Sequence, residues 1–333
     1  MRYSFLGSTG LKVSNIVLGT GTFGTGWGYA AERSVACKVF ENYRKAGGNF
    51  IDTADFYQFT EAEEILGELI AGDRDDIVVA SKFGMGETPN SSMQGTGNCR
   101  KAMAQCVEAS LRRLKTDRID MFWAHLPDGV TPMEEVVRGF EDLARSGKIL
   151  YAGLSNFAAW RTATAAMIAE FRGWTSIAAV QTEYNLMERS AEREIIPMAQ
   201  AFGMAALAWS PLGGGVLTGK YRRGETGRKQ ARDFGFQDDS DPRKAAILDA
   251  VFAVADESGH TPSQIALAWI LAKGILPIIG ARTQAQLDES IVAAGIELSG
   301  EQVGALDTAS FVEPGTPYFM PYTNRDGLTR GMT

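Results

Sequence analysis

The sequence predicts an α/β fold of the (β/α)8 TIM-barrel type, in which eight parallel strands close into a barrel inside a ring of helices. Short runs rich in β-branched residues alternate along the chain with long amphipathic segments, eight of each. Such barrels take about 250 residues and grow through loop insertions, so a chain of 333 residues suits one barrel. No low-complexity linker divides the sequence, and residues 1–333 are therefore expected to form a single domain. An open, doubly wound sheet would fit the same alternation.

The expected elements follow one another in a regular order. Residues 2–6 and 11–13 flank the turn sequence GSTG and predict a small N-terminal β-hairpin. The predicted barrel strands are residues 15–19, 49–52, 77–82, 119–124, 149–155, 177–181, 204–209 and 275–279. The predicted helices are residues 32–46, 61–71, 99–114, 132–145, 158–171, 191–202, 242–258 and 283–294.

The helix predicted over residues 132–145 carries the clearest signals of this kind. Thr131 and Glu134 form the pattern of a capping box, and Pro132 would occupy the first helical position. Gly147 is placed to end the helix before the next strand. The residues that form its apolar stripe are Met133, Val136, Val137, Phe140 and Leu143.

Two segments lie outside the repeating pattern. Residues 213–241, after the seventh strand, form an insertion rich in Gly, Arg and Asp, and we expect a long cofactor loop there. The tail from residue 311 onward is rich in aromatic residues and proline, and it is expected to be an ordered extension.

Composition and charge exclude several classes of function. The formal net charge is −7 and no long basic run is present, which argues against a nucleic-acid partner. No signal peptide is recognisable, and the longest apolar run, residues 265–279, is too short and interrupted to span a membrane. The three cysteines show no metal-ligand spacing. We therefore expect a cytoplasmic, reducing location, with no membrane partner and no metal.

Four polar residues lie at or just beyond the carboxyl ends of the early strands. These are Asp52, Tyr57, Lys82 and His125. In a (β/α)8 barrel those ends converge on one mouth, where side chains from several strands meet. The fold therefore predicts that these four side chains form one site.

This set suits proton transfer to a carbonyl that is being reduced by hydride. Such a reaction needs a group that hands a proton to the developing alkoxide. Tyrosine is a weak acid at its ordinary pKa of about 10, but a nearby ammonium such as Lys82 favours the phenolate and lowers that pKa. Asp52 would hold the ammonium charged and in place, and His125 could polarise the substrate oxygen.

Each of these residues, taken singly, also has an ordinary structural explanation. Asp52 could cap a turn, Lys82 could be solvated at a strand end, and His125 could be a packing residue. For His260, which precedes a helical segment, the structural explanation is the better one. Only the placement of Asp52, Lys82 and His125 together with Tyr57 favours a catalytic role.

These residues stand in sequence blocks that resemble the aldo-keto reductase superfamily, and the resemblance covers nearly the whole chain. FIDTADFY resembles the family block with the catalytic aspartate and tyrosine, SKFG the lysine block and DMFWAHLPD the histidine block. By position, the family's catalytic tetrad falls on Asp52, Tyr57, Lys82 and His125. Further matching blocks are GLSNF, QTEYNLMER, AWSPLGGGVLTGKY and PIIGARTQAQLDES. The LTGKY and GART segments are most similar to the bacterial reductases and the potassium-channel β-subunit-like branch.

The resemblance implies an NADP(H)-dependent oxidoreductase, and it also implies which residues bind the cofactor. Ser155, Asn156 and Gln181 would hold the nicotinamide carboxamide, since their side chains donate and accept hydrogen bonds, and Trp209 would stack on the ring. The pyrophosphate would be lined by Ser210, Pro211, Leu212, Gly213, Gly215 and Lys220. The remaining implied contacts are Thr20, Gly21, Asp52, Gly280, Arg282, Gln286, Glu289 and Ser290, most of them around the adenosine.

The expected preference for NADPH rests on Arg282. A guanidinium pairs with phosphate through two hydrogen bonds, which suits the 2′-phosphate. Two positions depart from the family pattern: Gly280 stands where many relatives have lysine, and Ser290 where many have asparagine. These departures leave some use of NAD open.

Two glycine-rich motifs resemble nucleotide-binding signatures of other folds. Residues 19–24 satisfy G-x-G-x-x-G after a strand, but helical periodicity starts only near Glu32, so a pocket-lining loop is the better interpretation. Residues 214–220 resemble a P-loop, yet Tyr221 stands where Ser or Thr would meet Mg²⁺. The sequence has no G-x-S-x-G motif of a serine hydrolase.

Aromatic residues are the candidates for the substrate pocket, because pockets of this kind are usually apolar with a few polar groups. Phe23, Trp27 and Trp123 are the preferred wall residues. The other candidates are Tyr29, Phe56, Phe83, Tyr318, Phe319 and Tyr322. The basic residues of the loop 219–241, which either close over the cofactor or are simply solvated, are Arg222, Arg223, Arg228 and Lys229.

Two functions from different classes fit the sequence. The first is reversible reduction of an aldehyde or ketone. The second is a redox-sensing regulatory subunit that binds NADP(H) and turns over slowly, which the similarity to potassium-channel β-subunits suggests. The sequence defines neither the natural small-molecule substrate, which loops determine, nor the oligomeric state.

Overall fold

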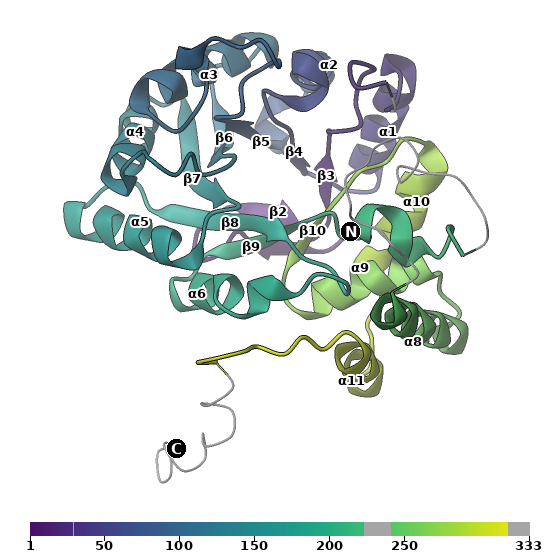
Figure 1. The fold of residues 1–333 in the computed structure, drawn as a ribbon. Helices are drawn as coiled ribbons and strands as arrows, with labels where there is room; N and C mark the ends of the chain where they lie inside the picture. The colour runs from purple at the N-terminus through teal and green to yellow at the C-terminus, as the bar shows by residue number, and fades with distance from the viewer. Residues whose placement is uncertain (29, 223–240, 319–333) are drawn as a thin grey trace.

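The computed structural model describes residues 1–28, 30–222 and 241–318, and within these ranges eight parallel strands close into a barrel (Figure 1). The predicted TIM barrel is thus confirmed and the open sheet is excluded. Six residues considered above lie outside the described residues, together with most of the loop 219–241: Tyr29, Arg223, Arg228, Lys229, Phe319 and Tyr322.

Each barrel strand pairs with the next along the chain, and β10 closes the ring on β3. All eight predicted strands are confirmed to within two residues at each end. Their bounds are β3 (Val17–Gly19), β4 (Phe50–Asp52), β5 (Val78–Phe83), β6 (Ile119–Ala124), β7 (Ile149–Ser155), β8 (Ile177–Glu183), β9 (Ala205–Trp209) and β10 (Leu276–Ile279).

The predicted hairpin closes the amino-terminal end of the barrel. Strands β1 (Tyr3–Phe5) and β2 (Lys12–Ser14) pair antiparallel. Leu6 and Val13, both fully buried, pack with Val17 and Phe50 of the barrel interior in one hydrophobic cluster. Because this end is filled with apolar side chains, polar chemistry is confined to the opposite end.

The eight predicted helices are present, and the described residues contain two more (Figure 1). The predicted ones are α1 (Arg33–Lys45), α2 (Glu61–Leu69), α3 (Arg100–Arg113), α4 (Met133–Arg145), α5 (Ala159–Arg172), α6 (Ile195–Ala201), α8 (Pro242–Ser258) and α10 (Gln284–Val292). The helices α9 (Pro262–Ala272) and α11 (Gly300–Ala309) were not among them. The longest of these, α8, has 17 residues, and no helix in the described ranges is long and apolar enough to cross a bilayer.

Short 3-10 helices occupy several of the connections. They are η1 (Tyr57–Thr60), η2 (Arg74–Asp76), η3 (Met93–Gly95), η4 (Ser190–Glu192), η5 (Gly213–Thr218) and η6 (Ala293–Gly295). The G-x-G-x-x-G segment belongs to none of the helices, since α1 starts only at Arg33. The interpretation of that segment as a loop is therefore confirmed.

The capping box predicted at Thr131 is wrong. The residue before the first helical one is Pro132, and α4 starts at Met133 with no side-chain cap. The Thr131 hydroxyl instead donates to Asp128 Oδ2 at 2.5 Å, because that carboxylate already accepts the Thr131 amide at 2.9 Å. Pro132 is likewise one position before its predicted place at the first helical residue, whereas the apolar stripe is buried and Gly147 follows the helix with a φ of 73°, both as predicted.

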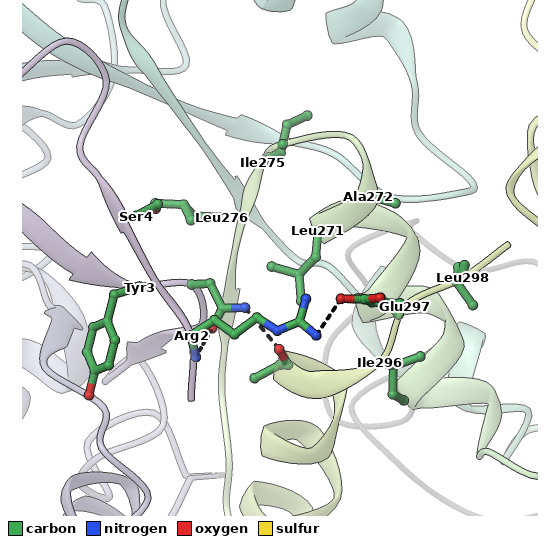
Figure 2. A pocket seen from close by; sticks show the side chains of 14 residues that line it. Arg2, Tyr3, Ser4, Leu271, Ala272, Ile275, Leu276, Ile296, Glu297 and Leu298 are labelled. Atoms are coloured by element: carbon green, nitrogen blue, oxygen red, sulfur yellow. Dashed lines mark hydrogen bonds and ion pairs between the residues drawn. The ribbon is translucent and has the colours of Figure 1, made fainter. Parts of the chain in front are cut away.

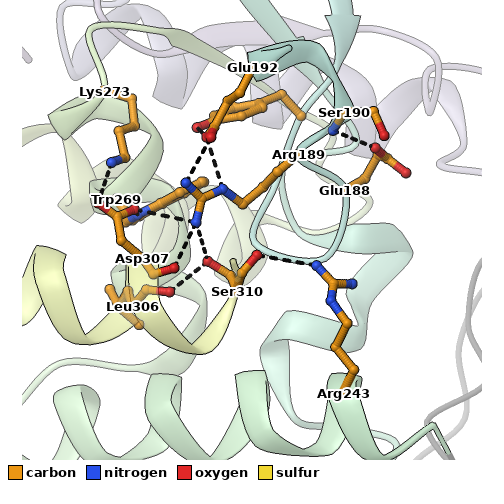
Figure 3. Close-up of polar contacts among 11 residues, drawn as sticks. Glu188, Arg189, Ser190, Glu192, Arg243, Trp269, Lys273, Leu306, Asp307 and Ser310 are labelled. Carbon is orange, nitrogen blue, oxygen red and sulfur yellow. Dashed lines mark hydrogen bonds and ion pairs between the residues drawn. The ribbon is translucent and has the colours of Figure 1, made fainter. Parts of the chain in front are cut away.

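A buried arginine ties the last helix to the body of the protein (Figure 3). Arg189 pairs with both carboxylate oxygens of Glu192, at 2.9 and 2.8 Å. Its Nη1 donates to the carbonyl of Asp307 at 3.0 Å and to Ser310 Oγ at 2.8 Å. The guanidinium lies 5.3 Å from the ring centre of Trp269 in α9. Helix α11 and the segment after it are thus fixed to the loop that follows β8.

Candidate active site

The four predicted catalytic residues meet at the carboxyl end of the barrel. Asp52 is the last residue of β4, Lys82 lies in β5, Tyr57 opens η1, and His125 follows β6. In parallel strands alternate side chains point inward, so Lys82 shares the interior face with Ala80 of the interior cluster. Lys82 and Asp52 are both buried, while Tyr57 and His125 are partly exposed.

Lys82 is the centre of this group. Its ammonium forms an ion pair with Asp52 Oδ2. It also donates to the carbonyl of Thr53 at 2.9 Å and to the Tyr57 hydroxyl at 3.0 Å. These three acceptors satisfy all three hydrogens of the ammonium, so the charge is fixed in one position beside the phenol.

The electrostatics of the pair favour a charged lysine. Burial opposes the ammonium, but the charges of Asp52 and Tyr57 outweigh it and raise the pKa of Lys82 above its ordinary value. Burial also opposes the charged form of Asp52 and raises the pKa of that carboxyl, although Lys82 and Gln181 act to lower it. We take the lysine as protonated at neutral pH, since two acceptors hold it in addition to the carboxylate.

Gln181, 129 residues further along the chain, completes the support of Asp52. Its Nε2 donates to Asp52 Oδ1 at 3.0 Å. The family resemblance implied only a cofactor contact for Gln181, so this second contact was not predicted. It arises because β8 faces β4 across the barrel, a relation that no local sequence signal reports.

His125 lies beside Tyr57 with its ring edge-on, at 5.9 Å between ring centres and 81° between planes. Its backbone N–H donates to the carbonyl of Phe83 at 2.9 Å. Nδ1 is buried and has no hydrogen-bond partner among the described residues. Burial, and next the charge of Lys82, lower the pKa of His125 well below its ordinary 6.5. The imidazole is therefore neutral at physiological pH.

A second polar group lies next to His125 and orients an indole ring. Asn156, at a φ of 62°, donates from Nδ2 to the His125 carbonyl at 3.1 Å and to Ser155 Oγ at 2.9 Å. Its Oδ1 accepts from Trp209 Nε1 at 2.8 Å. The three residues predicted to hold a carboxamide, Ser155, Asn156 and Gln181, thus form one connected patch with the predicted stacking residue Trp209 at the barrel mouth.

A glycine-rich turn follows Trp209, as predicted for the pyrophosphate strap. Ser210 has a φ of 55° and its carbonyl accepts from Asn185 Nδ2 at 3.1 Å. Gly213 and Gly215 also have positive φ, at 54° and 98°, and a Cβ on Gly215 would lie 2.8 Å from Lys220 Nζ. The Lys220 ammonium therefore lies directly over the backbone of Gly215, in a conformation that favours glycine. Pro211 is buried, and Leu212 packs against both core clusters outside the barrel.

The residues predicted for the adenosine end gather at the start of α10. Gln286 Oε1 accepts from the Arg282 amide at 2.9 Å, and Gly280 is exposed. Glu289 and Ser290 are engaged within the protein: Glu289 accepts from the Thr261 hydroxyl at 2.8 Å, and the buried Ser290 donates to the Gln286 carbonyl at 2.8 Å. For Ser290 this backbone contact is an alternative to the predicted one with adenine.

Thr20 and Gly21 lie at the edge of the catalytic group. Thr20 is buried and its amide donates to the Asp52 carbonyl at 2.9 Å. A Cβ on Gly21 would lie 3.7 Å from the Tyr57 ring, so the backbone of this loop packs directly on the phenol.

Of the three preferred wall residues, only Trp27 combines partial exposure with contact to the catalytic group. Its ring lies 6.0 Å from that of Tyr57, nearly perpendicular to it. Phe23 is fully buried in the cluster between the barrel and its helices, because the loop folds back there to pair with Ala31. Trp123 is also fully buried, in the interior cluster, with Nε1 unpaired among the described residues. The structure gives neither of these two an exposed surface.

Two further acids near the site were not predicted. Asp55 is fully buried with neither oxygen paired among the described residues, and burial together with the charge of Glu63 raises its pKa to about 8. Glu183 ends β8 in register with Trp209, and burial followed by the charge of Glu188 raises its pKa to about 7. The spacing of two residues from Gln181 was the only available signal for Glu183.

A cavity of about 510 Å³ lies at the other end of the barrel, between the hairpin, α9 and the segment after α10 (Figure 2). It is lined by residues such as Tyr3, Leu271 and Leu276, and Arg2 crosses it to pair with Glu297 at 2.7 Å. None of the predicted site residues lines it.

Comparison with known proteins gives a consistent result. A family model described as aldo/keto reductase family matches residues 15–310. Among the relatives, a norsolorinic acid reductase of Aspergillus flavus is 34% identical over 323 residues, covering 93% of this chain and 81% of the relative. An uncharacterized oxidoreductase, YrpG, of Bacillus subtilis is 35% identical over 328 residues, covering 95% and 97%. An aryl-alcohol dehydrogenase (NADP(+)) of Phanerodontia chrysosporium is 34% identical over 334 residues, covering 93% and 86%.

Proposed function

Because the chain belongs to the aldo/keto reductase family, and is therefore an oxidoreductase acting on carbonyl or alcohol groups, we propose that it reduces an aldehyde or ketone reversibly with NADP(H). Tyr57 is the proton donor in this proposal. The observation that carries it is the Lys82 ammonium, which is 3.0 Å from the Tyr57 hydroxyl and paired with the buried Asp52.

The proposed proton transfer follows from this arrangement. When the carbonyl carbon accepts a hydride, its oxygen gains negative charge and takes the phenol proton of Tyr57. The phenolate left behind is stabilised by the fixed ammonium of Lys82, in a buried setting where charges interact strongly. In the direction of alcohol oxidation, the same phenolate accepts the proton of the hydroxyl group.

His125 would assist without exchanging charge. A neutral imidazole carries one N–H, and its low pKa keeps it neutral at pH 7. Such a group donates a hydrogen bond to the substrate oxygen but does not compete with Tyr57 as an acid. The site thereby separates the polarising group from the proton donor.

The residues present fit a nicotinamide dinucleotide. Among the described residues, Gln181 Oε1 accepts no hydrogen bond and the Ser155 hydroxyl donates none, which gives a carboxamide one acceptor and one donor. Trp209 is held by Asn156 and offers a ring for stacking, and Lys220 above Gly215 suits a phosphate. When bound, this cofactor supplies the hydride.

We propose NADP(H) rather than NAD(H) because Arg282 stands at the start of α10, where a 2′-phosphate would meet it. One relative is named for NADP(+). Gly280 offers no second charge, so measurable use of NAD(H) is part of the proposal.

Aromatic carbonyl compounds are the first substrates to test. Trp27 lies 6.0 Å from Tyr57 and 5.4 Å from Phe56, measured between ring centres. Two relatives are named for aromatic chemistry, as a norsolorinic acid reductase and an aryl-alcohol dehydrogenase. A planar apolar substrate would bury its ring against this wall.

The decisive variant is Tyr57→Phe. General acid catalysis typically contributes about 100- to 10,000-fold, so we expect kcat for an aromatic aldehyde to fall by at least about 100-fold. NADPH binding, measured by fluorescence titration, should change little. Tyr151→Phe, in β7, is the matched control, because the Tyr151 hydroxyl makes no hydrogen bond within the described part of the chain. Wild-type-like turnover by Tyr57→Phe would contradict the assignment.

Within the family, we propose that this chain is most similar to the bacterial reductases and the potassium-channel β-subunit-like branch, on the basis of its LTGKY and GART segments. We likewise propose that residues 1–333 form one barrel domain.

The alternative function, a redox-sensing regulatory subunit, would release NADP(H) slowly and turn over slowly on every carbonyl compound. A kcat on the best substrate well above 1 per minute, with cofactor release at least as fast, would favour the enzyme.

A further inference from the structure

The backbone that follows Tyr57 has an unusual conformation. Gln58, Phe59 and Thr60 all have positive φ, at 53°, 56° and 83°. Residues other than glycine rarely adopt this region, and three in succession are held only where the surroundings fix them. The contacts that fix this turn are therefore informative about its purpose.

The side chain of Gln58 makes two of these contacts, both with the loop 21–28. Gln58 is 1% exposed. Its Nε2 donates to the carbonyl of Gly21 at 2.7 Å, and its Oε1 accepts from the backbone N–H of Trp27 at 2.8 Å. One amide group thus holds the loop near both of its ends.

Glu61, directly after the turn, holds the middle of the loop. Its Oε2 accepts from the backbone N–H groups of Thr25 at 2.6 Å and Gly26 at 3.2 Å. A Cβ on Gly26 would lie 2.5 Å from the carbonyl oxygen of Gln58, so the loop lies directly on the turn. The loop and the turn therefore form one unit.

The result of this docking is an aromatic wall next to the proton donor. Trp27 lies 6.0 Å from Tyr57, 5.4 Å from Phe56 and 6.5 Å from Phe59, measured between ring centres. Tyr57 also lies edge-on to His125, at 5.9 Å between ring centres. The amide that holds the turn of Tyr57 also holds the backbone of Trp27.

We propose that Gln58 is a positioning residue: it holds Trp27 beside Tyr57 and so gives the site its preference for aromatic over small aliphatic carbonyl substrates. The substrate preference in this proposal rests on the proposed function, whereas the positioning of Trp27 by Gln58 does not. Gln58 itself is buried behind the turn and does not touch the reacting atoms.

Two variants separate this role from simple support of the turn. Gln58→Gly adopts positive φ readily and removes both hydrogen bonds to the loop. Gln58→Glu keeps an acceptor for the Trp27 amide but replaces the donor to Gly21 with an oxygen. If Gln58 only supported the backbone, glycine would be the harmless substitution and would leave substrate preference intact.

The first readout is the ratio of kcat/KM for benzaldehyde to kcat/KM for propanal, with NADPH. An aromatic contact contributes up to about tenfold in affinity, so Gln58→Gly and Trp27→Ala should each lower this ratio by about tenfold, mainly through KM for benzaldehyde. The double variant should lower it no further, because both changes remove the same wall. An unchanged ratio in Gln58→Gly, or additive losses in the double variant, would overturn the proposal.

The second readout does not depend on catalysis. In Gln58→Gly the amide hydrogen of Trp27 loses its acceptor and should exchange at least about tenfold faster, and in Gln58→Glu it should stay protected. The amide of Gly97, which donates to Gly84 at 2.8 Å, is the internal control. If the wild-type protein reduces no carbonyl compound, the proposed function fails alone. If Trp27 exchange does not respond to Gln58→Gly, the positioning role fails alone.

Discussion

Lys82 is the residue on which the chemistry of the site depends. Its side chain is fully buried and its three hydrogen-bond acceptors come from Asp52, Thr53 and Tyr57. A buried charge is tolerated only when it is paired and fully hydrogen-bonded. The same contacts that make the ammonium acceptable in the interior therefore deliver its charge to the phenol.

Removing the ammonium should destabilise the protein as well as inactivate it. In Lys82→Met, Asp52 stays buried, and within the described part of the chain Gln181 is its only remaining side-chain partner. Breaking a buried pair in this way costs about 3–5 kcal/mol, which urea unfolding would measure. The double variant Lys82→Met/Asp52→Asn should recover part of that loss, since no unpaired carboxylate remains. A loss below about 1 kcal/mol in Lys82→Met would contradict the buried pair.

His125 should make the stability of the protein sensitive to pH in a defined window. Its pKa in the folded state is depressed well below the 6.5 of the unfolded chain. Below pH 6.5 the unfolded state therefore binds a proton that the folded state does not, and stability falls as the pH falls. Relative to His125→Gln, the wild-type free energy of unfolding should drop by up to about 1.4 kcal/mol per pH unit. Parallel stability curves of the two proteins between pH 6.5 and 5 would rule out the buried neutral imidazole.

At the scale of elements, helix α11 is connected to the glycine-rich turn after Trp209 through a single loop, the one that follows β8. Arg189 binds Asp307 and Ser310, while Asn185 in the same connection binds the carbonyl of Ser210 in the proposed cofactor strap. The loop after β8 therefore contacts both the strap and the last helix. Side chains with several donors, such as the guanidinium, are suited to such junctions.

Arg189→Met should loosen α11 selectively. Arg189 is 8% exposed, but Glu192 is 34% exposed, so the expected loss is about 2–3 kcal/mol, below the ~3–5 of a fully buried pair. Amide exchange in α11 should accelerate more than exchange in α4. Arg193→Met is the control, because that exposed side chain makes a single hydrogen bond among the described residues, to the Glu313 carbonyl at 3.0 Å. Equal effects of the two variants would argue against the junction.

The elements also show where sequence patterns succeed. The strands were predictable because β-branched runs in a parallel sheet are buried on both faces and stand out from the helices. Helix α9 was expected only as a helical segment after His260, without bounds, because residues from Ser263 to Ile270 are all buried, which removes the apolar stripe that periodicity detects. Its capping box at Thr261 and Gln264 was the signal available. Helix α11 has the same signal, at Ser299 and Gln302.

At the scale of the whole molecule, barrel closure turns separate strand ends into one site. The meeting of Asp52, Tyr57, Lys82 and His125 was predictable because each stands at or just beyond a strand end in a recognisable block. The hydrogen bond from Gln181 to Asp52 and the docking of Trp27 by Gln58 could not be predicted, because they depend on which side chains and loops meet once the barrel has closed. The same limit explains Phe23 and Trp123, whose sequence positions suggested the pocket but whose side chains pack inside the protein.

The central claim is that Lys82 acts through Tyr57, so that the two form one proton-donating unit. It is tested most directly by the single-turnover rate of NADPH oxidation with an aromatic aldehyde in four proteins: wild type, Tyr57→Phe, Lys82→Met and the double variant. Residues that act as a unit are strongly non-additive. We expect the double variant to be no more than about threefold slower than Tyr57→Phe alone. A rate that falls by the product of the two single losses would show that the lysine acts independently of the tyrosine, and would contradict the account.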